Sequence, residues 1–184
     1  MKKQKEKMDM QTMMEMYKKL ATPGEPHKLL ASLAGRWNTK SKSWMEPKKP
    51  PVESTGTCER KMLLGGRYLQ EEFSSEMMGS PFSGIGITGY DNDAKKYIMV
   101  WMDSMSTGIY LLEGSAGKDG KSITVKGRFV DPLRGPMKWN LTTRIIDNNT
   151  EIFEMQVIDK NNKKEKTEVT YTRKPAEQPA ELIP

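Results

Sequence analysis

Cysteine and histidine are nearly absent from this chain of 184 residues, which contains one of each. A single cysteine, Cys58, excludes an internal disulfide, a metal site built from several cysteines and a CxxC redox pair. Because His27 is the only histidine, no zinc site with two imidazoles can form, and a Ser-His-Asp triad would require this one histidine to face the interior. We therefore expect no metal site, no cofactor and no catalytic residue of these kinds.

Long apolar runs are also missing. No segment approaches the roughly 20 apolar residues that span a bilayer as a helix, and the basic N-terminus lacks the apolar core of about 7 to 15 residues that marks a signal peptide. If Met1 is the natural start, these absences favour a cytoplasmic protein with no membrane span.

The formal net charge is +6, and most of the excess comes from lysines near the two ends, between Lys2 and Lys19 and between Lys160 and Lys166. A nucleic-acid-binding chain would interleave its basic residues with exposed aromatic ones or carry a groove-reading module, and neither is present. The charge pattern is typical of solvated surfaces and does not favour nucleic acid or an anionic membrane as a partner.

Two helices are expected before the first strand. Apolar residues recur at helical spacing from Met10 to Ala21, and Thr22-Pro23-Gly24 ends this Met-rich amphipathic helix. A second, short helix begins at Pro26, a favourable first position, and stops at Gly35.

From Trp37 onward the apolar period changes to two, and clusters of Gly, Pro, Asn and Asp separate strand-sized segments. No helical crossover interrupts them, so neighbours in sequence should pair, and a sheet of about ten strands closes to remove its edges. We expect a mainly β fold: a single antiparallel up-and-down barrel of about ten strands, lipocalin- or calycin-like, preceded by two N-terminal helices. The predicted strands cover residues 36–44, 54–64, 67–77, 82–91, 97–103, 109–116, 121–130, 137–147, 151–159 and 166–174. The predicted organisation is a Met-rich helix in 1–21, a barrel domain with a short leading helix in 22–174 and a disordered tail in 175–184.

One hairpin can be placed in register from the sequence. If Gly65-Gly66 forms a two-residue turn, Arg60 lies opposite Glu71. Alternation then places one set of side chains on a common face: Cys58, Arg60, Met62, Leu69, Glu71 and Phe73. If this more apolar face points inward, it buries an Arg-Glu pair, which is costly unless the pair is fully hydrogen-bonded or meets a ligand.

Gly35-Arg36-Trp37 opens the first strand, and Tyr171-Thr172-Arg173 ends the last one. Arg173 shares a face with Val169 and Tyr171 and should therefore point inward. Stacked on the indole of Trp37, its guanidinium would contribute on the order of 0.5 to 2 kcal/mol. We assign Trp37 and Arg173 as structural residues that close one end of the barrel.

Several multi-residue motifs occur in order along the chain: Thr22-Pro23-Gly24-Glu25-Pro26-His27, Gly35-Arg36-Trp37, Met62-Leu63-Leu64-Gly65-Gly66-Arg67, Gly89-Tyr90-Asp91 and Trp101-Met102-Asp103-Ser104-Met105-Ser106-Thr107-Gly108. From about Met8 to Lys174 the chain resembles the uncharacterised, largely bacterial family called domain of unknown function fifteen-seventy-nine. The resemblance implies a calycin-like β-barrel and no established activity, ligand or catalytic residue. Haem-binding relatives, the nitrobindin-like barrels, need an imidazole inside the barrel, whereas His27 precedes the first strand, so axial ligation by histidine is not expected.

The methionines near the N-terminus allow two interpretations. Soft thioether sulfurs at helical spacing select Cu(I), but such a stripe is more often a flexible face that packs on a partner or across an opening. We favour a helix that lids the barrel or binds a second subunit in a homodimer. The cluster consists of Met8, Met10, Met13, Met14 and Met16.

Three functions remain open. The favoured one is binding of a small hydrophobic or amphipathic molecule inside the barrel, with aromatic walls and charged groups at a polar end. The others are an interaction module that uses the Met-rich helix and an enzyme that uses buried carboxylates on a hydrophobic substrate. Residues 103–108 either contact a ligand at the rim or only cap a turn. The candidate ligand-binding residues are Arg60, Glu71, Trp101, Asp103, Trp139 and Tyr171.

Overall fold

The computed structural model describes residues 9–46, 48–77 and 79–175. Two helices precede ten strands, and every strand expected from the sequence is present with boundaries within two residues of the prediction. The elements are α1 (Met10–Ala21), α2 (Glu25–Ser32), β1 (Gly35–Trp44), β2 (Val52–Leu63), β3 (Tyr68–Met77), β4 (Ser80–Asp91), β5 (Lys96–Asp103), β6 (Tyr110–Ala116), β7 (Ser122–Asp131), β8 (Gly135–Ile145), β9 (Thr150–Ile158) and β10 (Lys164–Arg173).

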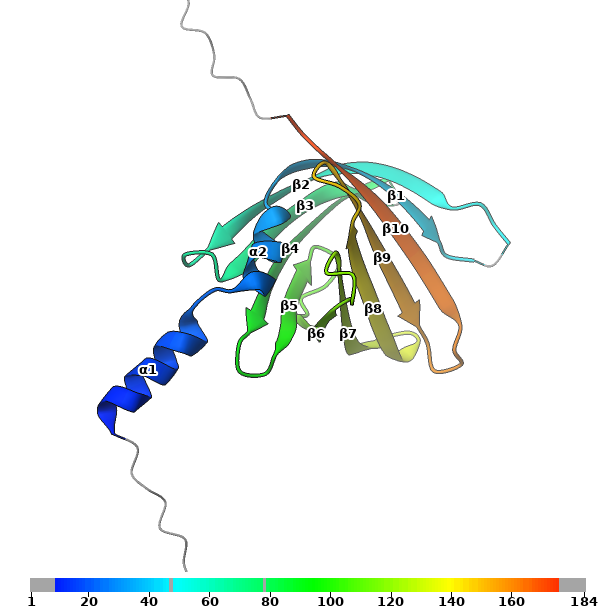
Figure 1. Cartoon of the computed structure of the whole chain (residues 1–184). Helices are drawn as coiled ribbons and strands as arrows, with labels where there is room; N and C mark the ends of the chain where they lie inside the picture. The colour runs from blue at the N-terminus through cyan, green and yellow to red at the C-terminus, as the bar shows by residue number, and fades with distance from the viewer. Residues whose placement is uncertain (1–8, 47, 78, 176–184) are drawn as a thin grey trace, which may run out of the picture.

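The strands form a closed antiparallel barrel in which each strand pairs with its neighbours in sequence, and β1 pairs with β10 to complete the ring (Figure 1). The closing register places Trp37 opposite Arg173 on one side and opposite Cys58 on the other. Closure leaves no free sheet edge, which is the reason that ten strands without a covering helix on each face form a stable unit. The predicted fold class, a mainly β up-and-down barrel after two helices, is confirmed.

Strand direction separates the connections into two groups, one at each end of the barrel. We call them the α2 end, where α2 and the turns after β2, β4, β6 and β8 lie, and the distal end (Figure 1). The distal connections span residues 45–51, 78–79, 104–109, 132–134 and 159–163.

The helix α2 covers its end of the barrel. Its N-terminus is capped by His27, whose Nδ1 accepts a hydrogen bond of 3.0 Å from the backbone N–H of Gly24. Leu30 and Leu33 are buried against the strands, and each such side chain contributes about 1.5 to 3 kcal/mol relative to an exposed one. They belong to one apolar cluster: Leu30, Leu33, Leu69, Tyr97, Leu112, Ile123, Val125 and Leu141.

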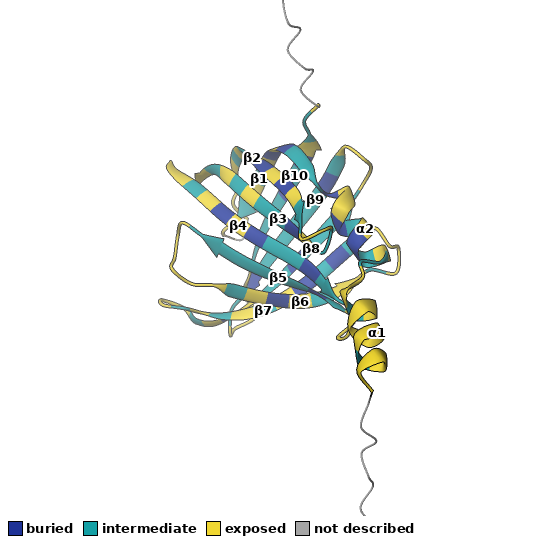
Figure 2. Ribbon diagram, turned by 90° about the vertical axis from the view of Figure 1, so that its left-hand side faces the viewer, coloured by how far each residue is buried: buried dark blue, intermediate teal, exposed yellow. Residues whose placement is uncertain are grey.

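The helix α1 does not cover the barrel, so the prediction that the Met-rich helix forms a lid is wrong. None of its residues is buried, and Met10, Met14 and Tyr17 are exposed (Figure 2). Its C-terminal end is held by Asn92, whose Nδ2 donates to the carbonyl of Leu20 at 2.7 Å. An amphipathic pattern sets which side of a helix is apolar but does not specify what covers it.

The structure does not test the other predictions for the two ends of the chain. Met8 lies outside the described residues, as does the tail predicted over 175–184 apart from Pro175. Binding of a second subunit through α1 stays a prediction.

The turn between β2 and β3 is longer than the two-residue turn expected. Residues 64–67 form it, and the N–H groups of Gly66 and Arg67 both donate to the carbonyl of Leu63. Leu64, Gly65 and Gly66 all have positive φ, so Leu64 leaves the extended conformation that pairing with Arg67 would require. The longer turn is centred on the same residues, and the predicted register from Leu63 with Tyr68 onward is therefore correct.

Candidate functional site

An ion pair lies inside the barrel where the predicted hairpin register places it. Arg60 of β2 is directly opposite Glu71 of β3, both side chains face inward, and Nε of Arg60 donates to Oε2 of Glu71. Arg60 is buried, whereas Glu71 keeps 17% of its side chain exposed.

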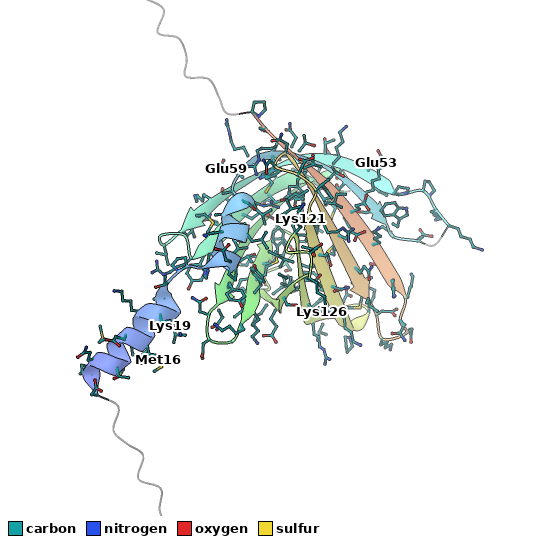
Figure 3. All side chains as sticks on the ribbon, in the orientation of Figure 1. Met16, Lys19, Glu53, Glu59, Lys121 and Lys126 are labelled. Atoms are coloured by element: carbon teal, nitrogen blue, oxygen red, sulfur yellow. The ribbon has the colours of Figure 1, made fainter. Side chains whose placement is uncertain are left out.

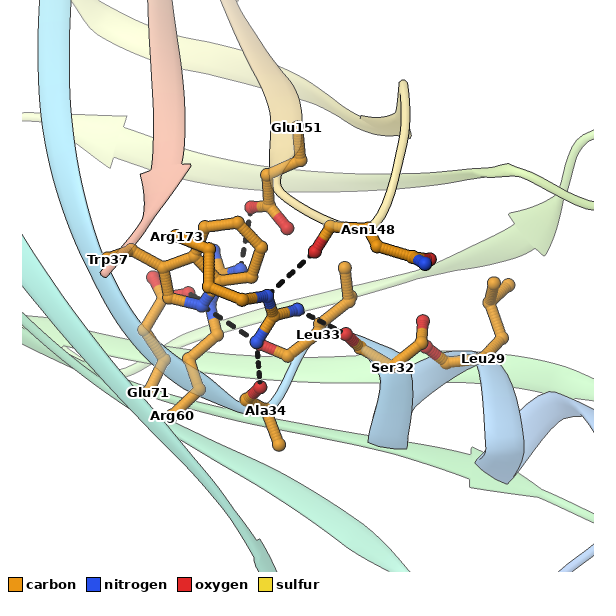
Figure 4. A network of polar contacts seen from close by, with 10 residues as sticks. All are labelled: Leu29, Ser32, Leu33, Ala34, Trp37, Arg60, Glu71, Asn148, Glu151 and Arg173. Carbon is orange, nitrogen blue, oxygen red and sulfur yellow. Dashed lines mark hydrogen bonds and ion pairs between the residues drawn. The ribbon is translucent and has the colours of Figure 1, made fainter. Parts of the chain in front are cut away.

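A second carboxylate completes the group. Nη1 of Arg60 donates to Oε1 of Glu151, near the start of β9, over 2.6 Å (Figure 4). Glu151 is completely buried, and its other oxygen, Oε2, has no hydrogen-bond partner among the described residues. We call Arg60, Glu71 and Glu151 the interior triad.

Sequence reasoning missed Glu151. Phe153, Met155 and Val157 share the inward face of β9, and one further step of two residues back along that face reaches Glu151. The signal was therefore present, but a charged residue beside the Asn148-Asn149 turn has the composition of a solvated strand end.

Burial and the ion pairs have opposite effects on the pKa values of this interior. Burial raises the pKa of Glu151, an effect that the nearby guanidinium of Arg60 only partly offsets. Burial alone would lower the pKa of Arg60, but Glu71 and Glu151 outweigh it and hold that pKa well above its usual value. Arg60 thus stays charged, and Glu151 is poised to take up a proton at a higher pH than an ordinary glutamate.

Aromatic rings border the cationic group. The guanidinium of Arg60 lies 4.5 Å from the ring centroid of Tyr171 and 5.7 Å from that of Trp37. Both rings are buried, and burial raises the pKa of the Tyr171 hydroxyl well above its usual value. Partly desolvated cations stacked on aromatic faces gain about 2 kcal/mol.

The predicted stacking of Arg173 on Trp37 is present, with the guanidinium 4.0 Å from the ring centroid. Arg173 also donates to the carbonyls of Ala34 at 2.6 Å, Ser32 at 2.8 Å and Asn148 at 2.7 Å (Figure 4). A cation at the carbonyl end of a helix is electrostatically favourable. Arg173 therefore ties the end of α2 to the turn between β8 and β9.

A cavity of about 60 Å³ lies beside the triad, under α2. Arg60, Glu71, Thr88 and Thr143 provide its polar lining. The remaining walls are apolar: Leu30, Leu33, Leu69, Met99, Ile123, Val125, Leu141 and Phe153. Sites for drug-sized molecules occupy roughly 300 to 1,000 Å³, so this cavity alone holds a small polar group or a few waters.

Trp101 and Asp103 form a pair farther along the inner wall, toward the distal end. Nε1 of Trp101 donates to Oδ2 of Asp103 at 2.9 Å, and the indole lies against Gly84 and Gly86, where a side chain would collide with it. Oδ1 of Asp103 accepts from the backbone N–H of Met105, which caps the following loop. This carboxylate thus holds both the indole and the start of the rim loop.

Trp139 lies in a third group, on the wall formed by β6, β7 and β8. Its ring is 4.7 Å from the ring of Tyr110 and 4.7 Å from that of Phe129. All three rings face inward, but none is fully buried. The distal half of the interior is therefore less completely filled than the half under α2.

The six predicted ligand-binding residues consequently divide into three groups. The structure brings Arg60, Glu71 and Tyr171 together and places the Trp101–Asp103 pair and Trp139 farther toward the distal end, where Tyr110 lies opposite Trp101 in register and contacts Trp139. His27 lies outside the barrel wall in α2, and burial lowers its pKa. Within the described residues no group of three or more histidine, cysteine or acidic side chains is arranged to hold a metal ion, and no helix is long and apolar enough to cross a membrane.

The fold is shared with solved structures of low sequence identity. Rv2717c from M. tuberculosis superposes with a TM-score of 0.60 and 14% identity, covering 84% of this chain and 100% of that one. The S-type phycobiliprotein lyase CPES from Guillardia theta superposes with a TM-score of 0.58 and 8% identity, covering 83% of this chain and 94% of that one. Similarity at this level shows the fold alone. A search of curated proteins found no match. Residues 22–173 match the family described as "Protein of unknown function (DUF1579)", and the chain therefore belongs to this family.

Proposed function

We propose that the barrel binds a small, partly apolar molecule in its interior, with the polar end of that molecule at the interior triad. The observation that carries this proposal is a buried ion network that borders a cavity with apolar walls. Burying three ionised groups costs free energy that well-packed apolar residues would not. A ligand that completes the network supplies a reason for its presence.

The groups of the triad that can still form a hydrogen bond are acceptors. Arg60 already donates to both carboxylates, and Arg173 donates to three carbonyls, whereas Glu71, which lines the cavity, keeps partial exposure. One guanidinium between two carboxylates leaves no surplus positive charge to meet an anion. The polar end of the ligand is therefore a hydrogen-bond donor, such as an amine, an amide N–H or a hydroxyl, and not a carboxylate.

Flat apolar ligands suit the rest of the interior. The rings of Trp101, Tyr110, Phe129 and Trp139 face inward while remaining partly accessible, and aromatic faces stack on planar groups. Because the cavity under α2 is small, the ligand body extends from it toward the distal end. CPES, which shares this fold, is a phycobiliprotein lyase, and a shared fold does not by itself assign that activity to another chain.

The test compares two probes of equal size. Calorimetric titration with 2-naphthylmethylamine and with 2-naphthoic acid should give tighter binding of the amine by about tenfold or more, corresponding to about 1.4 kcal/mol. Glu71→Gln should weaken the amine by a similar factor. Glu72→Gln, its neighbour on the outer face, is the matched control and should leave binding unchanged. Equal binding of both probes, or none of either together with a bare protein in native mass spectrometry after purification from its own host, would contradict the proposal.

A second function rests on α1. The exposed Met10, Met14, Met16 and Tyr17 are an apolar surface that nothing in the described chain covers. Flexible methionines are common at protein interfaces. If α1 mediates self-association, deleting residues 1–21 should roughly halve the particle mass measured by light scattering. The mass of a monomeric carrier should fall only by the mass of the deleted residues.

The structure gives less support to the third hypothesis, an enzyme that uses buried carboxylates on a hydrophobic substrate. Glu151 has the raised pKa that such a role needs, but it does not line the cavity. A general acid must reach the group that it protonates.

A further inference from the structure

We propose that one corner of the distal end docks the barrel on an anionic lipid surface. The corner consists of Arg128 and Val130 at the end of β7, Leu133 in the following turn, Lys138 on β8 and Lys160 after β9. This inference is independent of the ligand proposed for the interior.

A groove of about 370 Å³ crosses the corner. The pairing register sets Arg128 directly opposite Lys138 and Lys138 opposite Ile158. Since side chains alternate along a strand, and since Met137 is buried and Phe129 packs inward on Trp139, these three project outward. The groove is lined by Arg128, Phe129, Val130, Pro136, Met137, Lys138, Ile158, Asp159, Lys160 and Asn162.

The cations of the corner are not neutralised. Like charges directly opposite each other destabilise a sheet, yet Arg128 faces Lys138. Within the described parts of the chain, neither residue forms an ion pair or hydrogen bond through its side chain, and nor does Lys160. The acid in the groove, Asp159, accepts backbone N–H groups from its own turn.

Several cations elsewhere on the outer surface are paired with acids. Lys96 pairs with Glu113, Arg144 pairs with Glu154, and Arg134, close to the corner, pairs with both Asp131 and Glu165. The Lys96–Glu113 and Arg144–Glu154 pairs link neighbouring strands, whereas Arg134 links its own turn to β10. Other surface lysines, such as Lys118, Lys121 and Lys126, are also unpaired within the described residues, but at the corner Arg128 and Lys138 lie directly opposite each other, and an anion bound there would relieve their repulsion.

Apolar side chains stand beside these cations. Leu133 is 93% exposed and Val130 is 74% exposed. Oδ1 of Asp131 accepts the N–H groups of both Leu133 and Arg134, which fixes the turn that carries Leu133. Ile109, in the loop between β5 and β6 at the same end, is also exposed.

This combination matches a lipid surface. Apolar tips enter the boundary between headgroups and acyl chains while neighbouring lysines and arginines meet the phosphates. A nucleic acid would gain from exposed aromatic rings, and the ring in the groove, Phe129, packs inward against Trp139. Docking by this corner brings the distal end of the barrel to the bilayer.

Vesicle sedimentation of the full chain tests the proposal. Binding to phosphatidylcholine vesicles containing about 30% phosphatidylglycerol should exceed binding to pure phosphatidylcholine by at least about tenfold and should weaken with added salt. Arg128→Glu combined with Lys138→Glu should abolish the excess, and Leu133→Asp should reduce binding several-fold. Lys118→Glu combined with Lys121→Glu makes the same change in net charge at the α2 end and should retain binding (Figure 3).

Three results would overturn it. Equal losses in the corner and control variants would show attraction to net charge alone. Equal binding to both vesicle types would show no headgroup recognition. Concentration-dependent dimerisation in light scattering that Leu133→Asp removes, without vesicle binding, would assign the corner to a contact between copies. Circular dichroism of each variant establishes that the barrel is folded.

Discussion

Nη1 of Arg60 donates to Oε1 of Glu151 across the barrel interior at 2.6 Å, joining β2 to β9 through side chains that are 91 positions apart. No backbone pairing connects these two strands. The contact therefore depends on barrel closure, and it connects the hairpin that carries Glu71 with the strands that complete the ring.

The stability of this contact should depend on pH. Burial raises the pKa of Glu151 above its ordinary value of 4.5, so between that value and the raised one the native state binds more protons than the unfolded chain. The wild-type protein should then lose stability relative to Glu151→Gln as pH rises through this window, by up to about 1.4 kcal/mol per pH unit. Urea unfolding of both proteins between about pH 5 and pH 8 measures the difference. Parallel stability curves would show that Glu151 titrates normally.

Removing the cation should be more damaging than removing the network. Arg60→Met leaves two inward carboxylates without their donor, at a cost of about 3 to 5 kcal/mol. Replacing Glu71 and Glu151 by leucine in the same protein should recover most of that loss, because apolar residues need no partner. Lys61→Met, on the outer face of the same strand, should change stability by less than about 0.5 kcal/mol. A triple variant as unstable as the single one would contradict this account.

Arg173→Lys should loosen the junction between α2 and the barrel. A lysine cannot reproduce the fork that reaches the carbonyls of Ser32, Ala34 and Asn148, and losing two such bonds costs about 1 to 3 kcal/mol. Hydrogen exchange should show faster opening of the α2 amides than in wild type. Lys174→Arg, at the next position, serves as the control.

Gly84→Ala should displace the indole of Trp101. An added Cβ would overlap the ring, and overpacking of this kind costs about 1 to 3 kcal/mol. The hydrogen bond from Trp101 to Asp103 should break, which shifts the Trp101 indole N–H resonance in NMR spectra. Ser83→Ala, which faces outward on the same strand, should leave that resonance in place.

Local chemistry explains why so much of the barrel follows from the sequence. The period of two and the turn residues specify strands, and the turn centred on Gly65 and Gly66 sets the pairing of Arg60 with Glu71 even though it is longer than expected. The same alternation placed Arg173 on the inward face, where it stacks on Trp37.

Contacts across the barrel interior could be identified only from the tertiary structure. Alternation says that Glu151 faces inward but not which distant side chain it meets, because that depends on how ten registers add up around a closed ring. The cavity likewise forms only when the ring closes, because its lining comes from strands that are distant in the sequence. The sequence by itself determined the strands, their inward faces and the Arg60–Glu71 pair, since these depend on neighbours along the chain. Only closure of the ring decided that Glu151 joins them, since that contact depends on residues brought together from opposite ends of the sequence.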